Sequence, residues 1–176
     1  MNTNMTIADL HNAAPAAFAG LRALSEHVHQ SAIEPALVEL IWIRASQLNG
    51  CAFCVQMHTH AARKAGESDD RLQLLAVWRD TSFYSARERA ALAWTESLTR
   101  IDDSSMLEGG STLLREQFNE TERIHLAIAV TAINAWNRNG KGTSVEAGRV
   151  IDLCRGYNAT AKAAPINAVR NPLRYA

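Results

Sequence analysis

Residues 35–48 restrict what this chain can fold into more than any other segment does. Residues 37–43 are apolar apart from Glu39, a pattern typical of a helix buried in a core or at a subunit interface. Pro35 suits a first helical turn, because its missing N–H would have no partner there. The turn dipeptide Asn49-Gly50 ends the segment. The sequence therefore predicts a helix here that other parts of the protein must enclose.

The rest of the sequence predicts further helices, and therefore an all-α fold. Apolar residues recur at intervals of three and four, and alternating strand-like stretches are missing. One helix is expected from about Pro15, and one that contains the cysteines ends near Gly66. Ser68 is expected to cap the next helix, and Ser85 with Glu88 forms a capping box for the one after it.

The C-terminal part is expected to differ from the rest. Residues 102–111 read as a loop, followed by a short helix over residues 112–118 and a long helix from a Thr121 cap to about Arg138. Residues 139–142 (Asn-Gly-Lys-Gly) interrupt the helical pattern, and beyond them residues 145–153 alone keep an apolar stripe. We therefore expect a helical domain over residues 1–138 and a divergent extension over residues 139–176, which contains Cys154.

Charge and cysteine usage exclude several classes of function. The 176 residues contain 18 Lys+Arg and 18 Asp+Glu, so the basic surface that nucleic acid or an anionic membrane requires is not expected. The longest apolar stretch is far shorter than the roughly 20 residues that span a bilayer, and no secretory signal is recognisable, so we expect a cytoplasmic protein. Three cysteines are too few for a disulfide framework, so a close pair indicates catalysis, redox chemistry or metal binding.

Cys51, Cys54 and His58 form the most informative cluster. On a helix they lie within about 60° of one another and share one stripe. Two cysteines three residues apart in a helical turn have Cα atoms about 5 Å apart, which a disulfide tolerates, so the pair can cycle between dithiol and disulfide. Cys51 is expected at the helix start, where free N–H groups and the helix dipole stabilise a thiolate.

Glu39 is expected to serve the same cluster. In a nearly all-apolar helix its carboxyl group must be neutralised or hydrogen-bonded. Such a group can pass protons through His58 to and from the thiols. Breaking a peroxide O–O bond needs this relay, because a thiolate attacks, an alkoxide leaves, and the second thiol condenses the sulfenic acid into a disulfide. The structural alternative is an ion pair between Glu39 and a cation such as Arg44.

The arrangement of Glu39, Cys51-x-x-Cys54 and His58 resembles the active-site signature of the AhpD-like alkylhydroperoxidases, within the carboxymuconolactone decarboxylase-like superfamily. Flanking phrases that are also similar to that family are LIWIRASQLNGCAFC at residues 40–54, MHT at 57–59, ERAALAWTE at 88–96 and INAWN at 133–137. The likeness covers about residues 8–138. Better-studied members carry a further His inside the cysteine pair, where this chain has Phe53, and this departure predicts a low peroxidase rate.

The resemblance implies an all-α domain that packs into dimers, trimers or hexamers. It implies an oxidoreductase that acts on organic hydroperoxides or disulfides without metal, haem or flavin. Cys54 would be oxidised to the sulfenic acid, whereas the position of Cys51 at a helix start favours Cys51 as the more acidic thiol. An external dithiol, such as a lipoylated or thioredoxin-like protein, would close the cycle.

Two further functions are open on the sequence alone. A carboxymuconolactone decarboxylase would share the superfamily but would need neither thiol. A non-enzymatic oligomer would use the cysteines for zinc binding or redox sensing, with Cys51, Cys54, His58 and His60 as candidate ligands. His60 lies about 160° from His58 around a helix, which counts against a zinc site.

Overall fold

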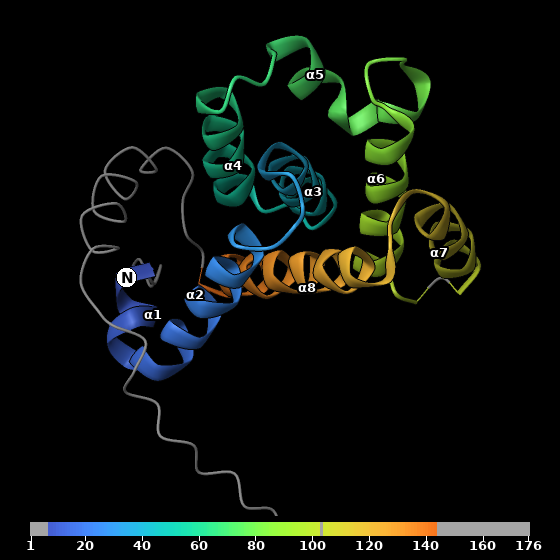
Figure 1. Cartoon of the computed structure of the whole chain (residues 1–176). Coiled ribbons are helices and arrows are strands. Elements are labelled where there is room, and N and C mark those ends of the chain that lie inside the picture. The colour runs from blue at the N-terminus through green and yellow to red at the C-terminus, as the bar shows by residue number, and fades with distance from the viewer. Residues whose placement is uncertain (1–6, 103, 144–176) are drawn as a thin grey trace, which may run out of the picture.

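Helix α3 (Pro35–Leu48) is the centre of the computed structural model, which describes residues 7–102 and 104–143. Figure 1 shows α3 between α4 (Ala52–Lys64) and α6 (Ala86–Thr99), with α8 (Glu120–Gly142) running across them. Contacts join α3 to all three of these helices and to α2 (Pro15–His29). The expected enclosed helix is therefore confirmed with its predicted bounds.

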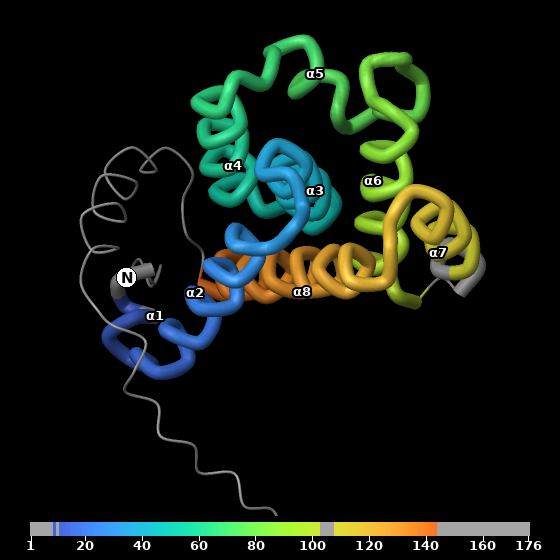
Figure 2. Tube along the Cα trace, viewed as in Figure 1, coloured from blue at the N-terminus to red at the C-terminus, as the bar shows by residue number. Residues whose placement is uncertain are grey.

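The remaining elements flank these helices in Figure 2, where α1 lies at the outer end of α2 and α7 lies beside α6. They are α1 (Ile7–Ala13), α5 (Asp69–Leu74), the 3-10 helix η1 (Leu75–Asp80) and α7 (Ser104–Gln117). Every regular element in the described part of the chain is helical, so the all-α class is confirmed. None of the helices described there is long and apolar enough to cross a membrane.

Two apolar clusters meet at α3. Val38 and Ile41 belong to a cluster shared with α2, α6, α7 and α8, whereas Leu40 and Ile43 belong to a cluster shared with α4, α5, η1 and α6. All four side chains are at most 1% exposed. Burying one such side chain completely contributes about 2 kcal/mol. The helix is apolar all round because it supplies both clusters at once.

Most predicted helix starts are confirmed. Ser68 caps α5 by accepting the Arg71 N–H, and Ser85 forms the expected capping box with Glu88 at the start of α6. The cap expected at Thr121 is wrong. Asn119 is the N-cap of α8 and forms a capping box with Glu122, so the helix begins earlier.

Two glycine-rich segments are helical where the sequence predicts a loop and an interruption. The loop expected over residues 102–111 is helical from Ser104, and a side chain at Gly110 would lie 2.5 Å from Ser97 Oγ, so this glycine permits close packing of α7 on α6. Likewise α8 does not end at Arg138 but continues to Gly142. Helix α1 was not predicted, and the helix expected over residues 145–153 lies outside the described residues, as does Cys154.

Glu96 joins α6 to α3 and η1 through a buried polar cluster. Its carboxylate accepts hydrogen bonds from Arg44 Nε at 2.7 Å, from Trp78 Nε1 at 2.8 Å and from Arg79. Burial acts to raise the pKa of Glu96, but the hydrogen bonds from Trp78, Arg79 and Arg44 outweigh it, and the pKa is lowered below its ordinary value. The carboxylate therefore stabilises the folded state while it is ionised.

We predict that Glu96→Gln lowers the free energy of unfolding at pH 7 by about 3 kcal/mol, because two arginines lose their carboxylate. A lowered native pKa means that the stabilisation is complete above the unfolded pKa, about 4.3, and is lost as the pH falls through the native value. Urea unfolding of both proteins between pH 3 and pH 7 measures this. The free energies of unfolding of the wild-type protein and Glu96→Gln should converge towards pH 3. Glu116→Gln on the exposed side of α7 is the control, and an equal effect there would contradict the prediction.

Candidate functional site

The four predicted site residues come from α3 and α4. Glu39 lies on α3, Cys51 is the N-cap of α4, Cys54 lies in its first turn, and His58 follows one turn later. Glu39 Oε2 is 2.9 Å from His58 Nδ1, and both residues are buried. The carboxyl group of the apolar helix therefore has a hydrogen-bond partner inside the site, as its position required.

Cys51 and Cys54 are joined by a disulfide, with their Cα atoms 5.4 Å apart. Their residues are 2% and 3% exposed. Cys51 Sγ also accepts the Cys54 N–H at 3.4 Å, which places this sulfur at the positive end of α4. Gly50 has a φ of 63°, a left-handed conformation that favours glycine and allows the chain to turn from α3 directly into α4.

Trp42 packs against the His58 ring. The two rings meet edge to face, with centroids 4.8 Å apart, and Trp42 Nε1 donates to the Ala129 carbonyl of α8 at 3.0 Å. With Nδ1 directed at Glu39, the second ring nitrogen of His58 is the one left to accept or donate a proton elsewhere in the site.

An amide cluster ties α8 to the turn that precedes Cys51. Asn49 Nδ2 donates to Asn137 Oδ1 at 2.8 Å and to Asn134 Oδ1 at 3.0 Å, and Asn137 Nδ2 donates to Ser46 Oγ at 2.9 Å. Asn137 is 1% exposed. Neither Asn134 nor Asn137 was singled out from the sequence as a site residue. Two amides three residues apart on one face of an apolar helix are the signal that could have found them.

Gly140, near the end of α8, lies directly against the disulfide. A methyl group placed on Gly140 would be 3.3 Å from Cys51 Sγ and 3.7 Å from Cys54 Sγ. Lys141 lies beside the same turn, since a methyl group on Gly50 would be 3.9 Å from Lys141 Nζ. The sequence predicts an interruption beyond the helical domain at these residues, whereas in the structure Gly140 lies on the sulfurs and Lys141 lies beside Gly50.

The part of the chain that the structure describes does not contain the alternative interactions considered for the predicted site residues, which are an ion pair of Glu39 with Arg44 and a zinc site that includes His60. Arg44 pairs with Glu96, not with Glu39. His60 is exposed, whereas His58 is buried. Within residues 7–102 and 104–143, no group of three or more His, Cys, Asp or Glu side chains is arranged to hold a metal ion. Phe53, which stands between the cysteines, is buried with them and with Met57.

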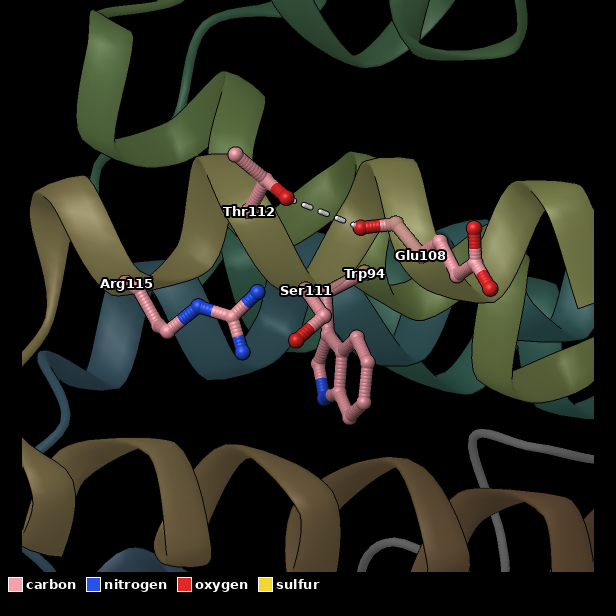
Figure 3. A pocket seen from close by; sticks show the side chains of 5 residues that line it. All are labelled: Trp94, Glu108, Ser111, Thr112 and Arg115. Atoms are coloured by element: carbon pink, nitrogen blue, oxygen red, sulfur yellow. Dashed lines mark hydrogen bonds between the residues drawn. The ribbon is translucent and has the colours of Figure 1, made fainter.

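Two open grooves lie on the described surface. One, of about 510 Å³, is lined by residues of α3, α4 and their turn, including Gly50 and Ala52 on either side of Cys51 in the chain. The other, of about 580 Å³, is lined by Trp94 of α6 and by Glu108, Ser111, Thr112 and Arg115 of α7. Figure 3 shows Arg115 and Ser111 directed to the same side as Trp94, with the Thr112 hydroxyl donating to the Glu108 carbonyl. None of the four predicted site residues lines either groove.

Comparison with known proteins identifies the family. Residues 15–97 match the carboxymuconolactone decarboxylase family. The chain is 40% identical over 115 residues to the uncharacterized protein YdfG of Bacillus subtilis, an alignment that covers 65% of this chain and 78% of that protein. The chain belongs to the carboxymuconolactone decarboxylase family.

Solved structures place the chain among the AhpD-like members of that family. A protein of unknown function from Agrobacterium tumefaciens, named as a candidate antioxidant defence protein AhpD, has a TM-score of 0.76 at 36% identity, with 81% of this chain and 97% of that chain covered. The alkylhydroperoxidase AhpD core of an uncharacterized peroxidase-related protein from Ralstonia eutropha JMP134 has a TM-score of 0.66 at 18% identity, covering 78% and 73%. The second likeness concerns the fold alone.

We predict that Asn137→Ala lowers the free energy of unfolding by about 2 kcal/mol, because Asn49 and Ser46 lose buried hydrogen-bond partners. It should also speed reduction of the Cys51–Cys54 disulfide by dithiothreitol, because the turn before Cys51 loses its tie to α8. Thr131→Ala is the control, since the exposed Thr131 hydroxyl donates to the Ala127 carbonyl within α8. Equal effects of the two substitutions on both measurements would refute this role.

Proposed function

We propose that the protein is a dithiol peroxidase that reduces organic hydroperoxides, with Cys51 and Cys54 as the redox pair and His58 with Glu39 as the proton relay. The observation that carries the proposal is the buried Glu39–His58 hydrogen bond one helical turn from a cysteine pair that forms a disulfide. Membership of the family and the names of the AhpD-like neighbours agree with peroxidase-related chemistry.

In the first step the Cys54 thiolate attacks the distal oxygen of the hydroperoxide. A sulfur–oxygen bond forms, the O–O bond breaks, and the leaving alkoxide takes a proton to become an alcohol. His58, held by Glu39 on one ring nitrogen, is placed one turn from Cys54 to handle that proton.

In the second step the Cys51 thiolate attacks the sulfenic sulfur of Cys54. The disulfide forms, the sulfur–oxygen bond breaks, and hydroxide takes a proton to leave as water. The dithiol and the hydroperoxide are thus converted into disulfide, alcohol and water. An external dithiol, for which a lipoylated or thioredoxin-like protein is our proposal, then reduces the disulfide by exchange. The proposal includes a homo-oligomer as the active form.

We expect the reduced protein to lose two thiols and about 2 Da on addition of one equivalent of cumene hydroperoxide, with release of one equivalent of alcohol. The experiment uses Cys154→Ser, which leaves only Cys51 and Cys54 of the three cysteines. Intact mass, a thiol titration and chromatography of the alcohol measure the three outcomes. The triple serine variant should be inert. An unchanged number of free thiols after addition of the hydroperoxide would contradict the proposal. Turnover of carboxymuconolactone by the triple serine variant would establish decarboxylase chemistry in its place.

The order of attack can be tested separately. In the Cys154→Ser background, Cys51→Ser treated with the hydroperoxide and dimedone should accumulate a dimedone adduct on Cys54, because no second thiol is present to resolve the sulfenic acid. Cys54→Ser should give little adduct. Peptide mapping by mass spectrometry locates the label. The opposite pattern would assign the attack to Cys51, as the helix-start argument alone suggested.

A further inference from the structure

The last turn of α8 covers both sulfurs of the redox pair. Gly140 packs against Cys51 Sγ and Cys54 Sγ so closely that an added methyl group would meet both. The two cysteines are 2% and 3% exposed. A reductant must bring its own sulfur into line with the disulfide, and it cannot do so while this turn is in place.

The turn is held less firmly than the helix before it. As far as Asn137, α8 is tied to the rest of the fold by side-chain hydrogen bonds to Asn49 and Ser46. Beyond it, the hydrogen bonds described for residues 138–143 run back into α8 itself, from Arg138 to Asn134, from Asn139 to Ala135 and from Thr143 to Asn139.

The composition of this turn also weakens it. Asn139, Gly140 and Gly142 are all poor helix formers, and each glycine disfavours a helix by about 1 kcal/mol relative to alanine. Helix ends open first, and they open at a free-energy cost far below that of global unfolding. The cover on the sulfurs is therefore the least stable part of the helix that carries it.

We propose that residues 138–143 form a gate, which unwinds beyond Asn137 to admit reactants to the Cys51–Cys54 pair. Gly140 is the residue that lets the gate close onto the sulfurs, and Gly142 is one of the residues that keep it easy to open. The gate serves the redox cycle of the proposed function, but access to the disulfide can be measured without any peroxidase activity.

Two glycines in one turn provide a matched test, because a side chain at Gly142 meets nothing within 4 Å whereas one at Gly140 meets both sulfurs. Gly142→Ala should stabilise the closed helix and slow reduction of the disulfide by dithiothreitol about fivefold. Gly140→Leu should prevent closure and speed reduction by a similar factor or more. Gly142→Leu is the size control and should slow it, as Gly142→Ala does.

The rate of thiol release is measured in the Cys154→Ser background, with hydrogen exchange of residues 138–143 as the second measurement. Exchange should fall in Gly142→Ala and rise in Gly140→Leu. If Gly140→Leu does not fold, Gly142→Ala and the exchange measurements decide alone. Equal rates in all variants would show that reactants enter elsewhere, such as the groove beside Gly50, and would overturn the gate. If the hydroperoxide assay fails but Gly142→Ala still slows reduction of the disulfide and Gly140→Leu still speeds it, the peroxidase activity would be refuted and the gate would stand.

Discussion

The hydrogen bond between Glu39 and His58 is the interaction on which the arrangement of this site depends. A carboxyl group in a helix that is buried on all sides needs a partner, and for Glu39 that partner is His58 of the next helix. Glu39 lies ten residues before Asn49, and His58 lies eight residues after Gly50. At 1.5 Å per residue, two helices that reverse at this turn bring the two side chains to similar heights. The left-handed Gly50 makes the turn tight enough for this to happen.

Helix α8 joins the parts of the site that α3 and α4 do not connect by themselves. Its Ala129 carbonyl holds Trp42, which packs on His58, and its Asn137 side chain holds the turn that leads to Cys51. Gly140 then lies on the sulfurs. One helix thus supports His58 through Trp42 and contacts the turn before α4 and the disulfide directly, so that its position bears on all three.

The sequence predicts well those features of this protein that residues close together in the chain determine. The bounds of α3, the capping box at Ser85 and the place of Cys51 at a helix start follow from nearby residues. The role of a glycine does not follow from nearby residues, because that role depends on which distant residues pack against the glycine. Gly110 faces Ser97 of another helix, and Gly140 faces the two sulfurs, so both look like breaks in the sequence and both are close contacts in the fold. Arg44 is a similar case, since its partner Glu96 lies on a distant helix.

The two cysteines have different surroundings, and the difference bears on their roles. Cys51 Sγ lies at the N-terminus of α4 and accepts a backbone N–H, an environment that stabilises a thiolate. A stabilised thiolate is also the better leaving group in thiol–disulfide exchange. An incoming reductant would then attack Cys54 and release Cys51, and in the oxidative half of the cycle Cys54, one turn from His58, would attack the peroxide. The expected thiolate character of Cys51 and the proposed nucleophilic role of Cys54 are therefore compatible, because the first concerns departure and the second concerns attack.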